Sequence, residues 1–354
     1  MKQSIQITLS GMLLSCLALF TGCGNNINEI MTVTGATPLA MQESVPGDAA
    51  LHITGLVKKE YDLSSRVLSK FATVRIRTRE VTAGGEYDGA YIYTGIPLYN
   101  ILEGVTPQKP KTAAFDRPLD MIVTLHSRSG KKAHFSYGEL VMTDDRHPCT
   151  LAFHRRELLP TKDPEKYTKN KYKDTVKGLR LISPRDPDTS RYLDDVTEMT
   201  LELLPAPDDR LPVMKKGAKC GSDGITVIRG KEAKPALFTG VERMKSIGWV
   251  RVGHGQGYKG VASAEGYGLR SFLKKNFKEC GPDSFFLFVA CDGYRVLLSG
   301  REIFLSNDGA ASMIADTLDG KGASGKYMLA PIDDYFVDRD VWGLTHVVML
   351  EGPR

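Results

Sequence analysis

The chain has 354 residues, of which 42% are hydrophobic and 25% are charged, and its formal net charge at pH 7 is +5. These fractions are typical of folded globular domains and exclude a disordered or collagen-like chain. After residue 23 no apolar run is long enough to cross a bilayer, so the remainder predicts no membrane-spanning helix.

The first 22 residues have the layout of an export signal. Lys2 precedes a short apolar stretch over residues 12–20, and small residues come directly before Cys23. This order is typical of a cleaved signal and not of folded structure. We therefore expect residues 1–22 to be removed and the mature chain to begin at Cys23.

Residues 19–23 (LFTGC) resemble the lipobox of bacterial lipoproteins, with Phe20 where Leu is usual. The resemblance implies that Cys23 carries a lipid and anchors the protein to a membrane. Gly24 after the cysteine favours the outer membrane in a cell that has one. An ordinary secretory signal is the alternative, in which case Cys23 is a free thiol. Residues 23–48 are predicted to be a polar tether.

The chain contains a long internal repeat. Five residues recur without a gap at an offset of 171, four more at 163, and later ones at 147 or 148. The pairs are Tyr87/Tyr258, Gly89/Gly260, Gly95/Gly266, Leu98/Leu269 and Leu102/Leu273, then Gly130/Gly293, Ser136/Ser299, Glu139/Glu302 and Ala152/Ala315, and finally Gly178/Gly325, Pro184/Pro331, Arg191/Arg339 and Thr197/Thr345. Solenoid units are shorter, so the repeat indicates a duplicated domain. We predict domains at residues 49–205 and 221–354, joined by a linker at 206–220.

Secondary structure is expected to be mostly short strands with a few helices. Residues 121–125 and 285–290 are short apolar runs that predict buried strands, each followed by a hairpin turn and a return strand over 131–136 and 294–299. Residues 98–102 and 269–277 have apolar side chains three and four apart, which predicts short amphipathic helices. Residues 196–204 and 344–350 predict the closing strands. We expect each copy to be an α+β domain with mixed β-sheets and short helices.

Four cysteines lie in the predicted domains: Cys149, Cys220, Cys280 and Cys291. In an exported protein four cysteines allow three disulfide pairings, which the sequence does not rank. Since Cys149 and Cys291 fall in apolar segments, we expect buried, inert thiols. The paired spacing of a zinc site is absent, so no metal site is predicted.

Three segments of the first copy together resemble a known family. They are residues 91–102 (YIYTGIPLYNIL), 151–160 (LAFHRRELLP) and 178–184 (GLRLISP). In order and spacing they are similar to the motifs of the oxidoreductase molybdopterin-binding domain, shared by sulfite oxidases and the bacterial periplasmic methionine sulfoxide reductase catalytic subunit. The second copy is more distant and matches through Tyr258, Gly260, residues 291–294 and residues 326–331. The resemblance implies tandem, divergent domains of the sulfite oxidase type.

The family's metal-ligand cysteine is missing from both copies. It belongs between a strand and the first motif, where this chain has residues 74–82 (VRIRTREVT) and 249–255 (WVRVGHG). Thiolate suits that role because it is a soft, strongly donating ligand. Oxygen-atom transfer by the family mechanism is therefore not expected, and no catalytic residue is assigned.

Cofactor binding without catalysis is still compatible with the sequence, because the molybdenum cofactor carries a phosphate that arginines can hold. Arg75, Arg77 and Arg79 alternate along a predicted strand and so share one face. Arg180 and Arg185 come from the segment that supplies phosphate contacts in the family, and His254 lies between Gly253 and Gly255. The alternatives are a solvated strand face and a polar histidine in a glycine-rich turn.

Two further features have plain structural alternatives. The first copy holds about 16 extra residues within 155–177, rich in Lys and Arg, which suit anionic lipid headgroups or an acidic partner protein, or form a solvated loop. Glu139 and Glu302 recur at matching positions, and such recurrence in a duplicated fold usually indicates a structural role. Because they lie in separate predicted domains, we see no reason for them to act together. Nucleic acid is not an expected partner of an exported protein.

The sequence therefore predicts a lipid-anchored cell-envelope protein whose tandem domains serve as a cofactor- or anion-binding or assembly module. A periplasmic molybdenum-dependent oxidoreductase with an unusual ligand set is the first alternative. A structural lipoprotein that uses its domain interface to hold an envelope partner is the second.

Overall fold

The computed structural model describes residues 43–143, 146–158, 175–215, 220–221, 224–323 and 325–353. One compact unit extends from Val45 to Arg354. The predicted signal peptide, the lipidation site Cys23 and most of the tether lie outside the described residues. Within those residues, no helix is both long enough and apolar enough to cross a membrane.

The first half contains a five-stranded sheet in the order β2-β1-β9-β5-β6. Its strands are β1 (Ala50–Gly55), β2 (Tyr61–Ser64), β5 (Met121–Ser127), β6 (Lys132–Ser136) and β9 (Val196–Leu203). β1 runs parallel to β9, and the other neighbours are antiparallel. Six of the seven residues of β5 are buried, which explains why this strand is almost continuously apolar.

A second sheet of the first half has the order β3-β4-β7-β8 and is antiparallel throughout. Its strands are β3 (Val74–Val81), β4 (Tyr87–Pro97), β7 (Thr150–Glu157) and β8 (Thr175–Ile182). Short helices join the strands: α2 (Ser65–Leu68), α3 (Leu98–Glu103), η1 (Pro118–Asp120) and α4 (Tyr137–Val141). Residues 159–174, most of the predicted basic insertion, lie outside the described residues.

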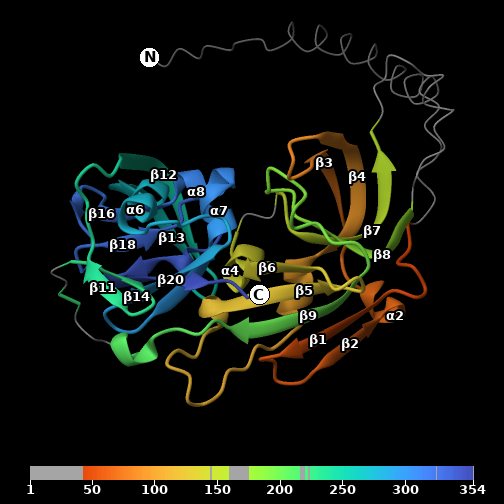
Figure 1. Cartoon of the computed structure of the whole chain (residues 1–354), viewed down its shortest axis with the longest axis horizontal. Helices are drawn as coiled ribbons and strands as arrows, with labels where there is room; N and C mark the ends of the chain where they lie inside the picture. The colour runs from red at the N-terminus through yellow and green to blue at the C-terminus, as the bar shows by residue number, and fades with distance from the viewer. Residues whose placement is uncertain are drawn as a thin grey trace, which may run out of the picture. The chain divides into compact units, whose positions relative to one another are not determined.

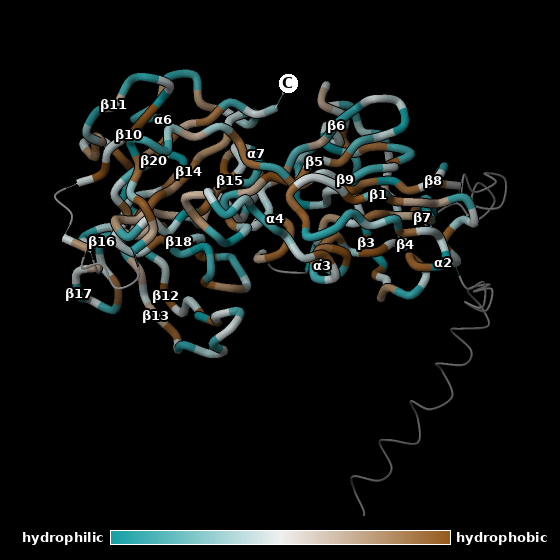
Figure 2. The backbone as a smooth tube through the Cα atoms, turned by 90° about the horizontal axis from the view of Figure 1, so that it is seen from below, coloured by the Kyte–Doolittle hydropathy of each residue, from teal (hydrophilic) through white to brown (hydrophobic). Residues whose placement is uncertain are grey.

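The second half repeats this topology (Figure 1). One sheet has the order β11-β10-β20-β14-β15, and again its first and last strands along the chain, β10 and β20, are parallel. Its strands are β10 (Thr226–Arg229), β11 (Glu232–Pro235), β14 (Ser284–Ala290), β15 (Arg295–Ser299) and β20 (Leu344–Glu351). Figure 2 shows the tube coloured as hydrophobic along β14, all seven residues of which are buried.

The other sheet of the second half has the order β12-β13-β16-β18-β19, and β17 pairs with β16. Its strands are β12 (Arg243–Gly253), β13 (Gly257–Gly268), β16 (Met313–Leu318), β17 (Lys321–Gly322), β18 (Met328–Ala330) and β19 (Val341–Trp342). The helices are η2 (Asp208–Arg210), α6 (Leu269–Asn276), α7 (Gly300–Phe304), α8 (Asn307–Ala311) and η3 (Val337–Arg339).

The expectation of an α+β fold is wrong, because the described chain is mostly β-structure in four sheets. The predicted helices at 98–102 and 269–277 do form, but α6, at eight residues, is the longest helix in the described ranges. Each short helix only turns the chain between two strands. Helices of this length cannot form a layer that covers a sheet, so sheet packing dominates the architecture.

The two halves share buried apolar contacts. Phe115, Leu119 and Met142 of the first half pack in the main core of the second half, with Phe288 and Leu344. Part of the predicted linker is also buried: Leu211 is 6% exposed and packs with β14 and β20 residues, and Arg295 donates to Asp208. Residues 206–211 are therefore held against the second half.

The expectation of inert thiols is wrong for two of the four cysteines. Cys220 and Cys291 form a disulfide, with 5.6 Å between their Cα atoms. It ties the chain ahead of β10 to the end of β14. Cys149 is a buried free thiol, and Cys280 is free and partly exposed. Cys291 follows an apolar run and was therefore expected to be buried as a free thiol. The run ends with β14 at Ala290, and Cys291 lies just beyond the strand, where it pairs with Cys220.

Candidate functional site

The two halves meet through a buried polar cluster in which equivalent residues exchange hydrogen bonds. Ser136 caps α4, accepts from the Glu139 amide at 3.1 Å, and donates to Oε1 of Glu302 at 2.9 Å. Ser299 caps α7, accepts from the Glu302 amide at 3.1 Å, and donates to Oε2 of Glu139 at 2.8 Å. No reason for the two glutamates to act together was visible in the sequence, but each accepts a hydrogen bond from the serine that caps the other half's helix.

Two arginines neutralise this cluster in the same way in each half. Arg191 donates to Glu139 at 2.6 Å and to both carboxylate oxygens of Asp186. In the same way, Arg339 donates to Glu302 at 2.6 Å and to both carboxylate oxygens of Asp334. Burial raises the pKa of Glu302 to about 7, although Arg339 opposes the rise. These pairs fix the two loops that follow β8 and β18.

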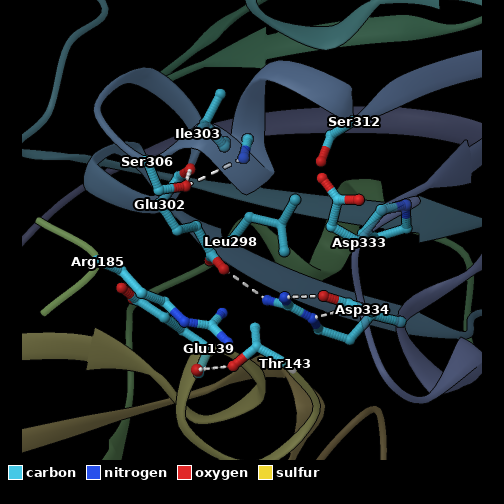
Figure 3. Close-up of a pocket in the computed structure, with 13 residues that line it drawn as sticks. Glu139, Thr143, Arg185, Leu298, Glu302, Ile303, Ser306, Ser312, Asp333 and Asp334 are labelled. Carbon is cyan, nitrogen blue, oxygen red and sulfur yellow. Dashed lines mark hydrogen bonds and ion pairs between the residues drawn. The ribbon is translucent and has the colours of Figure 1, made fainter. Parts of the chain in front are cut away.

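A small cavity lies inside this cluster and is drawn in Figure 3. Its volume of about 20 Å³ holds no more than a water molecule. Figure 3 shows Arg185 in this cavity beside Glu139 and Thr143. Arg185 and Ser306 also line a much larger hollow, so the buried cluster positions one wall of that hollow.

The larger space, which we call the arginine hollow, has a volume of about 710 Å³. Its lining comes from β3, from the first residue of β4, from the loops before β7 and after β8, and from the α7–α8 connection of the second half. The residues are Arg77, Thr78, Arg79, Val81, Tyr87, Arg146, His147, Pro184, Arg185, Asp186, Pro187, Tyr192, Leu305, Ser306 and Asn307. This volume is within the usual range for small-molecule sites.

The lining of the arginine hollow is strongly cationic. Arg77 and Arg79 are exposed on β3, whereas Thr78 between them and Glu80 after them are buried. Neither arginine forms an ion pair within the described part of the chain. Asp186 is the carboxylate among the described lining residues, and both of its oxygens are bound by Arg191. Four arginines and one histidine therefore line this hollow, together with one carboxylate.

The structure brings together three of the six predicted site residues: Arg77, Arg79 and Arg185 line the arginine hollow. Arg75 lies on the same exposed face of β3 but is not among the described residues that line the hollow. The hollow also contains Arg146, His147, Tyr87 and Tyr192, which the sequence did not single out. Arg146 and His147 lie a few residues before the second family-like motif, and this proximity was the available signal.

Arg180 has a structural role instead. It bridges Glu80 at 3.4 Å and Asp194, and its guanidinium lies over the rings of Tyr93 and Tyr192 at 6.0 and 5.7 Å. Glu80 is 1% exposed, so this ion pair balances a buried charge. Its Nη1 and Nη2 donate to Asp194 and Glu80, and Arg180 is not among the described residues that line the hollow.

His254 lies apart from the other predicted residues, in the exposed turn between β12 and β13. Its backbone amide donates to Oδ2 of Asp338 at 2.8 Å, and its ring meets the edge of Phe336 at 4.9 Å between centroids. These contacts hold the turn and leave the imidazole outside the arginine hollow.

The arginine hollow fits a phosphate but not the metal of the molybdenum cofactor. No cysteine is among its described lining residues. Cys149 is buried and is not part of this lining; its Sγ lies 3.5 Å from Oγ of Ser183, and burial raises the pKa of its thiol to about 12. In the described ranges no three His, Cys, Asp or Glu side chains group as a metal site requires. The donors therefore suit an oxyanion, and we derive no redox step.

Comparisons with known proteins add little. No family model and no curated protein matches the chain. Among solved structures, it is similar to the crystal structure of the sulfane dehydrogenase SoxCD from Paracoccus pantotrophus, at 13% identity and a TM-score of 0.33. The match covers 71% of this chain and 59% of that one. A similarity this distant assigns neither a fold nor an activity.

Proposed function

We propose that this chain is a binding protein of the cell envelope that holds a phosphate-bearing small molecule in the arginine hollow and does not turn it over. The observation that carries the proposal is the concentration of Arg77, Arg79, Arg146 and Arg185 around one space of about 710 Å³. Guanidinium groups bind phosphate oxygens through paired, charge-assisted hydrogen bonds, so this lining favours a phosphate or diphosphate ester.

The hollow also favours a ligand with an organic part. Tyr87 and Tyr192 stand at its sides, and its volume far exceeds that of a single phosphate ion. Aromatic rings provide flat apolar surface for a planar group. A pterin phosphate of the kind implied by the family resemblance meets both requirements, and it would be held without the metal-ligand thiolate.

The envelope location is part of the proposal. The signal-like first 22 residues and Cys23 imply export and a lipid anchor to the membrane. The Cys220–Cys291 disulfide supports an oxidising compartment, because structural disulfides are rare where cytosolic reductants act. An envelope protein could then meet the chain at the membrane surface.

Calorimetric titration of the full chain with inorganic pyrophosphate tests the binding site. Wild-type protein is expected to bind saturably, and the Arg77→Ala/Arg79→Ala double variant to bind about 10²-fold more weakly, about tenfold for each lost charge-assisted contact. Arg75→Ala is the matched control, since it removes the same charge from the same face of β3 outside the lining. If Arg75→Ala weakened pyrophosphate binding equally, the loss of affinity would reflect the overall charge of this face, and the proposed site would be overturned.

A further inference from the structure

A second pocket lies in the second half of the chain, with a volume of about 290 Å³. It is built from the β12–β13 turn, the segment around η3 and β19, the turn after β14, and Arg117 of the first half. Gly253 and Gly255 contribute backbone without side chains, which leaves room for a ligand. We call this space the Asp340 pocket.

The Asp340 pocket occupies a place in the second half related to that of the arginine hollow in the first. Each is bordered by the first hairpin of its antiparallel sheet, β3–β4 or β12–β13. Tyr192 lines the hollow, and the residue 148 positions later, Asp340, lines the pocket. The duplication therefore produced two cavities whose linings have diverged in charge.

Asp340 is held rigidly but incompletely paired. It is 5% exposed, and its Oδ2 accepts from Arg251 at 3.3 Å, whereas its Oδ1 has no hydrogen-bond partner among the described residues. Arg251 is itself clamped between the indoles of Trp249 and Trp342, at 5.0 and 5.1 Å. A buried acceptor without a partner is costly, so a ligand donor at this oxygen would be stabilised.

The opposite charge is present on other walls of the same pocket. Arg117 lies over the Tyr294 ring at 5.4 Å, and Lys259 lies on β13. Neither forms an ion pair with a residue in the described ranges. Asp292 and Asp338 also line the pocket, and each accepts a hydrogen bond from a backbone amide. The described lining therefore holds two cations and three carboxylates, and Asp340 is the carboxylate whose buried oxygen has no hydrogen-bond partner among the described residues.

We propose that the Asp340 pocket binds a small zwitterion of the α-amino acid class. The ammonium group donates to Asp340, the carboxylate contacts Arg117 and Lys259, and an apolar side chain lies against Trp342 and Tyr294. The volume suits a molecule of this size, and the separated charges disfavour a simple anion or cation. Burial raises the pKa of Asp340, and a bound ammonium would stabilise its charged form.

Tryptophan fluorescence tests the proposal directly. The chain has two tryptophans, Trp249 and Trp342, and both flank Arg251, the partner of Asp340. Trp342 lines this pocket, and neither tryptophan is among the described residues that line the arginine hollow. L-Norleucine is the probe, with hexanoate and pentylamine as analogues that lack the ammonium or the carboxylate. At about pH 8, norleucine is expected to change the emission saturably and to bind at least about tenfold more tightly than either analogue.

Two substitutions locate the binding. Asp340→Asn and Lys259→Ala are each expected to weaken norleucine binding about tenfold or more. Lys245→Ala is the matched control, because Lys245 is on the same hairpin but pairs with Glu265 outside the pocket. Lys259 is exposed, so its variant keeps the test valid if Asp340→Asn fails to fold.

A saturable response that both analogues reproduce would overturn the zwitterion assignment. So would the absence of any response in the wild type, or unchanged affinity in Lys259→Ala. Pyrophosphate binding at the arginine hollow is measured separately, so either site can fail without the other.

Discussion

Oγ of Ser299 donates to Oε2 of Glu139 at 2.8 Å, across the contact between the two halves of the chain. The equivalent residues, Ser136 and Glu302, make the equivalent bond in the other direction at 2.9 Å. The two halves therefore meet through equivalent residues that exchange hydrogen bonds, as in a twofold-symmetric dimer. Beside this contact lie Arg185 of the first half and Ser306 of the second, and both also line the arginine hollow.

Substitution of Ser299 by Ala should lower the free energy of unfolding by about 1–3 kcal/mol. The change removes the cap of α7 and leaves a buried oxygen of Glu139 without its donor. Ser136→Ala should behave similarly, and urea denaturation measures both. Additive effects in the double variant would mean that the two bonds are independent, contrary to a shared network.

The pH dependence of stability should contain a contribution from Glu302. Its pKa in the folded state is about 7, against an ordinary value of 4.5, so the folded chain holds a proton that the unfolded chain releases. Stability from this group is therefore fully present below about pH 4.5, falls as pH rises toward 7, and then stays constant, a change of up to about 3 kcal/mol.

Melting temperatures recorded across this pH range check that contribution. Glu302→Gln should show a flatter profile between about pH 4.5 and 7 than the wild type. Glu279→Gln, at an exposed carboxylate, should retain the wild-type profile. If melting temperature changed equally with pH in all three proteins, a group other than Glu302 would be responsible for the pH dependence.

Arg180 should matter for stability and not for ligand binding. Arg180→Ala leaves the buried Glu80 carboxylate without its cation, which should cost about 3–5 kcal/mol in the free energy of unfolding. Arg75→Ala, an exposed position on β3, should change stability by less than about 0.5 kcal/mol. A thermal melt of Arg180→Ala indistinguishable from wild type would show that Glu80 needs no such partner.

The Cys220–Cys291 disulfide should stabilise the folded chain by about 2–4 kcal/mol, since it closes a segment with a sequence separation of 71. Thermal unfolding followed by circular dichroism, with and without reductant, measures this. Reductant should lower the melting temperature of the wild type and of Cys280→Ser, and leave Cys220→Ser/Cys291→Ser unchanged. A reductant-insensitive wild type would contradict the pairing.

Local patterns in the sequence predicted individual strands well. The strands over 121–125, 285–290 and 344–350 are confirmed as β5, β14 and β20. β5 and β14 are buried almost throughout, which is why each is a run of apolar residues. The short helices at 98–102 and 269–277 were also predicted correctly, but the fold class was wrong because it gave them the weight of a structural layer. At six and eight residues, α3 and α6 only connect strands.

The candidate site was partly visible in the sequence. Alternation placed Arg77 and Arg79 on one exposed face of β3, which is a local property. Arg180 was misjudged, since its partner Glu80 lies 100 residues earlier and no spacing reveals that pairing. The recurrence of Glu139 and Glu302 likewise reported a duplication without showing that the copies contact each other.

The central claim is that the arginine hollow holds a phosphate-bearing molecule without a redox metal. The most direct measurement is elemental analysis and mass spectrometry of the ligand released from full-length protein purified from its native host. The account predicts an organic phosphate in stoichiometric amount, with molybdenum and tungsten far below one atom per chain. Stoichiometric molybdenum or tungsten bound with a pterin would contradict it.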